Sequence, residues 1–208
     1  MSISPIHLAK YRKHLAPFVE FTDEEWELFA EHLYIKEVKK KECWVTSMHT
    51  CKEVGYILNG AFRFFFVRDG VEISNYFCFA GELVSAYGSF LKQQPGQGNI
   101  QAMEDATLIC FSYNSLQQLL QDERTAFKME RFGRKVAEYL ICCYEERLTA
   151  FITQTPEQRY MELVTRNAEL LQRIPQHYVA NYLGVTPESL SRIRKRLANA
   201  AKKQRAVA

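Results

Sequence analysis

The sequence has 208 residues, 47% of them apolar and 25% charged, which is typical of one or two globular domains and excludes a disordered or collagen-like chain. No stretch approaches the roughly 20 consecutive apolar residues that cross a membrane, and no signal peptide precedes the first charges. We therefore expect a cytoplasmic protein with no membrane partner. Six cysteines in a chain of this size do not indicate a secreted disulfide framework.

Charge is unevenly distributed along the chain. From Thr186 to the end there are seven basic residues and one acidic residue, so this segment has a formal charge of +6, whereas the whole chain has +3. A basic end on an otherwise mildly acidic protein indicates a polyanionic partner, with a solvated helix face as the alternative. The basic residues are Arg192, Arg194, Lys195, Arg196, Lys202, Lys203 and Arg205.

Helical spacing characterises the first part of the chain, to about Leu33. Thr22 is followed by three acidic residues, which favours a helix that begins with Thr22 as its N-cap. Apolar residues then recur at helical intervals at Trp26, Phe29, Ala30 and Leu33.

From Tyr34 to about Tyr113 the sequence consists of short β-branched and aromatic runs separated by turn residues. Asn59-Gly60 and Asp69-Gly70 predict hairpin turns, because both central positions of such a turn need positive φ. Ala80-Gly81 ends a further strand, and residues 93–98 form a loop. The regular spacing of strands and turns predicts a β-sandwich or barrel.

A long helix is predicted from about Glu123 to Thr153, followed by a helix that starts at Thr155-Pro156. Two apolar stripes on the long helix suggest that one docks on its own chain and the other on a second subunit; a helix buried on two sides within one chain is the alternative. One stripe contains Met129, Phe132, Val136, Tyr139 and Cys143, and the other contains Leu140, Tyr144, Leu148 and Phe151. We assign the dimer contact to Met129, Phe132, Val136, Tyr139, Leu140 and Cys143.

The segment from Gln176 to Leu197 is the most informative. It predicts two short helices joined by a tight turn at Gly184, the pattern of a helix-turn-helix that offers its second helix to the DNA major groove. An ordinary helical hairpin with a charged surface is the alternative. The inward-facing residues are Val179, Ala180, Leu183, Val185, Leu190, Ile193 and Leu197.

The other residues of the second helix are the candidate DNA contacts. Arg192 can pair with guanine O6 and N7, and Glu188 can accept a hydrogen bond from cytosine N4. Hydroxyls and the remaining cations are expected at phosphates. The full set is Thr186, Pro187, Glu188, Ser189, Ser191, Arg192, Arg194, Lys195 and Arg196.

At this point the chain resembles the Crp/Fnr family of bacterial transcription regulators over nearly its whole length. The run Ile174-Pro175-Gln176 and the stretch from Tyr182 to Arg192 are especially similar to the Bacteroidetes branch. The resemblance implies an α+β protein with a jelly-roll (β-roll) sensor domain over residues 1–122. It also implies a dimerisation helix over residues 123–153 and a C-terminal all-α helix-turn-helix domain over residues 154–208.

The family's function implies a sequence-specific DNA-binding transcription regulator and not an enzyme. Its partners would be a pseudo-palindromic double-stranded operator and a second copy of itself, with RNA polymerase and an unidentified small-molecule effector as further candidates. Family members often carry Arg, Glu and Arg at the base-reading positions. Here Pro187 stands at the first, while Glu188 and Arg192 match the others. The chain also ends soon after Leu197, which leaves little room for a β-wing.

In cyclic-nucleotide-binding relatives, a Gly-Glu pair holds the ribose, and an Arg about ten residues later neutralises the phosphate. Gly81-Glu82-Leu83 looks like that pair. However, the turn from Phe79 to Glu82 is more similar to the Gly-Asp/Glu turn that directly precedes the phosphate-binding segment in these relatives. The usual Gly-Glu is then Ser85-Ala86, and the usual Arg-Ser is Gly96-Gln97. A buried phosphate without a cation is costly, so cAMP binding of the family's usual kind is not expected; another ligand, or none, fits better. The candidate pocket contains Glu82, Leu83, Ser85, Ala86, Gly96, Gln97 and Tyr144.

No catalytic residues, metal site or other cofactor are identified. Of the five histidines, only His49 lies in the β region, too few for a metal-dependent jelly-roll enzyme. The cysteines lack metal-ligand spacing, and the Cys142-Cys143 pair is expected to be structural, with a redox role as the alternative. The alternative function is a ligand-sensing signalling module, similar to cyclic-nucleotide-binding proteins, whose main role is not DNA binding.

Overall fold

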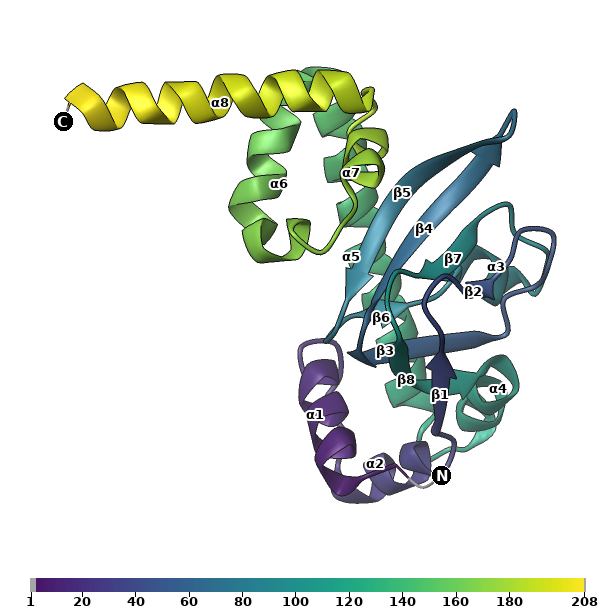
Figure 1. Ribbon diagram of the computed structural model, residues 1–208. Helices are drawn as coiled ribbons and strands as arrows, with labels where there is room; N and C mark the ends of the chain where they lie inside the picture. The colour runs from purple at the N-terminus through teal and green to yellow at the C-terminus, as the bar shows by residue number, and fades with distance from the viewer. Residues whose placement is uncertain (1–2, 208) are drawn as a thin grey trace. The chain divides into compact units, whose positions relative to one another are not determined.

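The described part of the chain forms two four-stranded sheets with helices around and after them (Figure 1). The computed structural model describes residues 3–207, and within that range every side chain except those of residues 166–170 and 201–207. The first sheet contains, in spatial order, β1 (Tyr34–Val38), β8 (Ala106–Ser112), β3 (Glu53–Asn59) and β6 (Leu83–Val84). The second contains β2 (Cys43–Val45), β7 (Asn99–Ala102), β4 (Ala61–Arg68) and β5 (Val71–Phe79). The helices are α1 (Pro5–Leu15), α2 (Asp23–Ala30), α3 (Tyr87–Lys92), α4 (Tyr113–Gln121), α5 (Ala126–Thr153), α6 (Pro156–Leu171), α7 (Gln176–Tyr182) and α8 (Pro187–Val207).

The chain divides into two compact units. One unit is Met1–Val67 with Asn75–Cys142, and the other is Arg68–Ser74 with Cys143–Ala208. The first holds both sheets, α1 to α4 and the first part of α5. The second holds the tip of the β4–β5 hairpin, the last part of α5 and all of α6 to α8. The domain boundaries at residues 122 and 153 stay a prediction.

The strand connections confirm one predicted hairpin and correct another. Asp69 and Gly70 have φ of +52° and +74° and join neighbouring strands β4 and β5, as a turn with two positive φ values requires. The hairpin predicted at Asn59-Gly60 is wrong, because β3 and β4 lie in different sheets. Gly60 (φ +106°) turns the chain from one sheet to the other, where an added Cβ would lie 2.5 Å from the Cβ of Ala106. The position therefore needs glycine for a crossing between the sheets.

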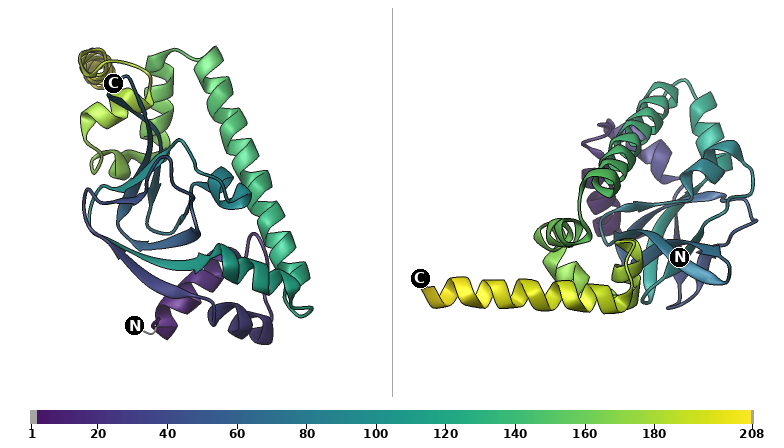
Figure 2. Two further views of the ribbon diagram at one scale, coloured as in Figure 1. Left: turned by 90° about the vertical axis from the view of Figure 1, so that its right-hand side faces the viewer. Right: turned by 90° about the horizontal axis from the view of Figure 1, so that it is seen from above.

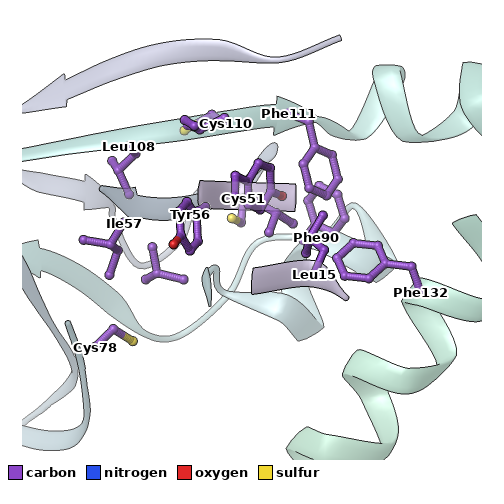
Figure 3. Close-up of a cluster of buried hydrophobic side chains, with 14 of the residues drawn as sticks. Leu15, Cys51, Tyr56, Ile57, Cys78, Phe90, Leu108, Cys110, Phe111 and Phe132 are labelled. Carbon is purple, nitrogen blue, oxygen red and sulfur yellow. The ribbon is translucent and has the colours of Figure 1, made fainter. Parts of the chain in front are cut away.

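Aromatic contacts hold α1 and α2 on the first sheet. Tyr11 stacks on Tyr56 with ring centroids 4.6 Å apart, and Phe29 meets the ring of Phe111 edge-on at 5.7 Å. Figure 3 shows Tyr56 and Phe111 in one cluster with Phe132 of α5. Helix α2 begins as predicted, because the Thr22 hydroxyl caps it and the Glu25 carboxylate accepts a hydrogen bond from the Thr22 N–H.

Glu53 links the two sheets through three hydrogen bonds. Its carboxylate accepts from the Tyr34 hydroxyl at 2.7 Å, the Lys36 ammonium at 2.5 Å and the Trp44 indole at 3.0 Å. Burial raises the pKa of Glu53, but these donors outweigh burial, so the pKa lies below its ordinary value. Since Tyr34 and Lys36 belong to β1 and Trp44 to β2, one carboxylate connects both sheets to β3.

We predict that Glu53→Gln lowers the free energy of unfolding at pH 7 by about 1–3 kcal/mol, because the amide cannot accept from all three donors. The folded-state pKa is depressed, so this stabilisation is present above the unfolded pKa of about 4.3 and is lost as the pH falls through the folded value. Urea unfolding of both proteins from pH 7 to pH 3 measures the difference. Glu37→Gln, an exposed neighbour on β1, is the control. A difference that stays constant over this range would contradict the account.

Candidate nucleic-acid interface and ligand pocket

Helices α7 and α8 lie where the sequence predicts the two helices of a helix-turn-helix. Leu183 closes α7, and Gly184 then adopts φ +72°, the left-handed conformation that a tight turn needs. The turn is held by hydrogen bonds from the Gly184 N–H to the Asn181 carbonyl and from the Val185 N–H to the Ala180 carbonyl, both 3.0 Å. The side chains buried between the helices are Val179, Ala180, Leu183, Leu190 and Ile193.

The N-terminal turn of α8 exposes a short polar face. Thr186 caps the helix, since its hydroxyl accepts from the Ser189 N–H at 3.2 Å. Glu188, Ser191, Arg192 and Lys195 follow on the exposed side. The pKa of Glu188 is lowered by its own backbone N–H, by the Thr186 hydroxyl and by the charge of Arg192, so Glu188 is an anion at neutral pH. Pro187 stands at the first helical position, where its missing N–H costs nothing.

Two of the predicted phosphate contacts already bind other helices of their own unit. Arg194 donates to the side chain of Gln176 on α7, and Arg196 pairs with Glu157 on α6 at 2.7 Å. Both pairs are exposed and contribute little stability, but they hold α8 against its neighbours. The cations of α8 that face outward without such a partner in the described part are Arg192 and Lys195.

Helix α8 does not stop where a β-wing would begin. It continues as a single helix to Val207, and no strand follows α7 in the described residues (Figure 2). Lys202, Lys203 and Arg205, which complete the predicted basic segment, lie outside the described side chains. The helix therefore carries the basic segment from Arg192 onward along one continuous element.

The structure divides the predicted dimer contact on α5. Met129 and Phe132 are 1% and 4% exposed and belong to the core of their own chain, and Val136 packs against that core. Met129 and Phe132 are therefore not available to a second subunit, whereas Val136 is only half-buried at the edge of that core. Tyr139 is exposed, and Leu140 and Cys143 are half-buried.

A different face of α5 carries an exposed apolar stripe. Its members follow one another at intervals of three and four residues, which places them on one side of the helix. They are Ile141, Tyr144, Leu148 and Ile152, each more than half exposed. Tyr144, which we also placed in the ligand pocket, therefore lies on this stripe.

In and beside the candidate pocket, side-chain hydroxyls and amides form hydrogen bonds with backbone groups. The Ser85 hydroxyl donates to the Glu53 carbonyl at 3.0 Å, and the Ser89 hydroxyl accepts from the Cys51 N–H at 3.0 Å. The Gln93 side chain donates to the carbonyls of Cys51 and Phe90. These bonds attach α3 and the residues beside it to the start of β3 and the residues just before it. Helix α3 was not predicted from the sequence.

The remaining pocket residues do not form a phosphate site among themselves. Glu82 accepts from the Phe79 N–H at 2.9 Å, and burial raises its pKa. Leu83 pairs with Tyr56 in the sheet, Ala86 is buried, and Gln97 is exposed. Gly96 bonds through its backbone to Met48 and His49.

The second sheet carries one buried arginine, Arg63, whose side chain points away from the core of the roll. Arg63 on β4 is 1% exposed, and its guanidinium donates twice to the Gln101 side chain, at 2.9 and 2.7 Å. Its neighbour Phe62 belongs to the core, and successive side chains of a strand face opposite sides. Arg63 therefore does not replace the phosphate-binding arginine of cyclic-nucleotide-binding proteins.

Two arginines beside the turn between α7 and α8 are absent from the site residues predicted from the sequence. Arg147 of α5 and Arg159 of α6 donate to the carbonyls of Tyr182 and Leu183. An isolated arginine on an amphipathic helix gives no sequence signal for such a contact, because its acceptors are backbone atoms distant in the chain. Within the described residues, no group of three or more His, Cys, Asp or Glu is placed to hold a metal. None of the described helices is long and apolar enough to cross a membrane.

Comparisons with known proteins agree with this architecture. No family model and no curated sequence matches the chain. The structure of the c-di-GMP responsive global regulator CLP from Xanthomonas campestris is 15% identical and covers 86% of this chain and 93% of its own, with a TM-score of 0.68. FixK2 from Bradyrhizobium japonicum is 18% identical and covers 81% of this chain and 86% of its own, with a TM-score of 0.65.

Those two proteins are Crp/Fnr regulators, so the predicted fold of a β-roll, a long helix and C-terminal helices is confirmed. At these identities the likeness shows the fold alone, and membership of the Bacteroidetes branch stays a prediction. A more limited likeness exists to the regulatory domain of Toxoplasma gondii PKA with cAMP, which is 10% identical with a TM-score of 0.50. It covers 56% of this chain and 45% of that one.

We predict that cAMP does not bind at micromolar concentrations. In the register that the sequence predicts, Gly96 and Gln97 stand where cyclic-nucleotide-binding relatives carry the cation, and the Ser85 and Ser89 hydroxyls are already bonded to backbone. Titration calorimetry with cAMP measures this directly, with 5′-AMP as a control for binding through adenine alone. A dissociation constant in the micromolar range or tighter would show that this register of the pocket is wrong.

Proposed function

We propose that this protein is a sequence-specific DNA-binding transcription regulator of the Crp/Fnr type that acts as a homodimer in the cytoplasm. One observation carries the proposal. The α7–turn–α8 unit exposes Glu188, Arg192 and Lys195 at the start of a basic helix. A helix-turn-helix presents this part of its second helix to base edges in the major groove.

Side-chain chemistry assigns different roles to the exposed residues of α8. Arg192 is suited to guanine O6 and N7, and Glu188 to cytosine N4. The backbone N–H of Glu188 and the Thr186 hydroxyl lower the pKa of Glu188, and the charge of the nearby Arg192 makes a smaller contribution in the same direction. Lys195 and the hydroxyl of Ser191 are suited to phosphates, and phosphate contacts position the protein without reading sequence.

The exposed stripe on α5 supports a homodimer. Ile141, Tyr144, Leu148 and Ile152 form a continuous apolar face that water would otherwise contact, and a second copy of the same helix is its simplest cover. Two copies related by a two-fold axis would offer two α8 helices, and such dimers bind pseudo-palindromic operators. RNA polymerase is a further candidate partner.

The β-roll has the fold of a ligand-binding sensor domain, but its candidate pocket lacks the arginine that binds the cyclic phosphate in relatives. An effector of another class, or none, is consistent with hydroxyls that are bonded to backbone. Tyr87 of α3 also donates to the Gly133 carbonyl of α5 at 3.2 Å. A ligand that moved α3 would therefore act on the helix that carries the proposed dimer contact.

The alternative is a signalling module that does not act on DNA. It is favoured by one observation, the likeness of about half of this chain, 56%, to the PKA regulatory domain. Binding to random double-stranded DNA at low salt separates the two functions, because a regulator binds non-specific DNA electrostatically and a pure sensor does not.

We predict opposite signatures for two substitutions on α8. Arg192→Ala should cost about 1–3 kcal/mol per half-site and relax base preference at one position, since it removes a base contact. Lys195→Ala should weaken all sequences alike and reduce the slope of log affinity against log salt by about one unit per half-site. Fluorescence anisotropy on operators obtained by selection from random DNA measures both effects.

Arg131→Ala is the matched control for these variants. It removes the same charge as Arg192→Ala, but from an exposed site on α5 outside the helix-turn-helix. It should leave base preference unchanged. If Arg192→Ala keeps both affinity and base preference, α8 does not read DNA and the proposed function is wrong.

We predict that Leu148→Glu converts the dimer to a monomer, because it places like charges opposite each other across the two-fold axis. Light scattering should give about twice the 24.3 kDa chain mass for the wild type and that mass for the variant. Thr149→Glu adds the same charge to the exposed side of α5 beside the stripe and should remain dimeric. A wild type that is monomeric at micromolar concentration would refute the dimer.

A further inference from the structure

The end of α7 is held by two arginines from other helices of the same compact unit. The Arg147 guanidinium of α5 donates to the Tyr182 carbonyl at 3.2 Å, and that of Arg159 on α6 donates to the Leu183 carbonyl at 3.0 Å. Carbonyls at a helix C-terminus have no partner within the helix and lie at the negative end of its dipole. Two positive groups therefore satisfy the acceptors directly before the turn that leads to α8.

Aromatic rings fix the planes of both guanidiniums. The Cζ atom of Arg147 lies 3.9 Å from the ring centroid of Tyr182 and 4.9 Å from that of Phe151. The Cζ atom of Arg159 lies 4.5 Å from the same Phe151 ring. Phe151 also approaches Gly184, where an added Cβ would lie 3.2 Å from its ring. We call Arg147, Phe151, Arg159 and Tyr182 the turn clamp.

The turn clamp depends on guanidinium geometry more than on charge. Burial lowers the pKa of Arg147; Tyr182 raises it, the nearby charge of Arg159 lowers it, and the net pKa lies below its ordinary value. Neither side chain has an ion pair with a carboxylate in the described part of the chain. A lysine would keep each charge but lose the planar fork and the stacking. These positions therefore need arginine for its directional hydrogen bonds and its stacking on aromatic rings.

The turn clamp connects two surfaces that the proposed function uses. The last part of α5 carries Tyr144, Leu148 and Ile152 of the exposed stripe, and Arg147 and Phe151 lie between them on the same helix. In a dimer joined through that stripe, the clamp fixes the turn, and with it the start of α8, relative to the two-fold axis. The distance and rotation between the two α8 helices depend on this connection.

We propose that Arg147 and Arg159 are positioning residues that set which spacing between two DNA half-sites the dimer accepts. This proposal rests on the proposed function. One base pair added between half-sites moves them apart by about 3.4 Å and rotates one by about a tenth of a helical turn. A rigid connection tolerates few such changes, whereas a loosened one lets each helix-turn-helix adjust independently.

The experiment compares the wild type with the double variant Arg147→Lys, Arg159→Lys. Affinities are measured for operators whose half-sites are separated by the selected spacer, or by one or two base pairs more or fewer, and for a single half-site. We expect the ratio between best and worst spacing to fall by about tenfold, the factor that one hydrogen bond to a charged group supplies. Single half-site affinity should change less than about twofold, since lysine preserves the charge. Arg131→Lys is the control and should match the wild type.

Each result has one meaning. A wild type that binds no sequence refutes the proposed function, and the positioning role falls with it. A wild type that binds, with a double variant that keeps the same spacing preference, refutes the positioning role alone. Equal loss at every spacing and at the single half-site also refutes it, because general destabilisation would act in that way. Thermal unfolding checks that the double variant folds. If it does not fold, the same affinities are measured for Arg147→Lys alone, and the same results support or refute the positioning role.

Discussion

A single chain can cover only one of the two apolar faces of α5. The face with Met129 and Phe132 completes the core of the β-roll unit, and this leaves Ile141, Tyr144, Leu148 and Ile152 exposed on another side. A second copy on the exposed face would make the protein two-fold symmetric, and two-fold symmetry would turn one DNA-reading helix into a pair with a defined separation.

The connection from α5 and α6 to the turn before α8 is made through backbone acceptors. Arg147 and Arg159 satisfy the free carbonyls at the end of α7, and their planes are fixed by Phe151 and Tyr182. Arg194 and Arg196 instead hold α8 to α7 and α6 through side-chain acceptors, the amide oxygen of Gln176 and the carboxylate of Glu157. These four arginines therefore hold α5 to α8 of this unit together. Only some of the cations near α8 stay available for contacts with phosphates. Net charge alone overstates the number of DNA contacts for this reason.

Local chemistry made some features predictable from sequence, and distant contacts hid the others. The cap at Thr22, the turn at Asp69-Gly70 and the left-handed Gly184 depend on neighbouring residues, and the structure has each of them. Asn59-Gly60 satisfied the same local pattern but leads between two sheets, because strand pairing is decided by residues far along the chain. Likewise, helical periodicity identified apolar stripes on α5 without showing that the Met129 stripe faces its own core. The bonds of Ser85 to Glu53 and of Ser89 to Cys51 were hidden for the same reason.

The most direct test of the central claim is hydroxyl-radical footprinting of the wild-type protein on DNA selected from a random pool. A two-fold pair of α8 helices predicts two protected patches on one face of the duplex, centred about 34 Å, or one helical turn, apart. The patches should have the same sequence on opposite strands. Protection of a single patch, or uniform protection without sequence preference, would contradict a dimeric regulator that reads DNA through α8.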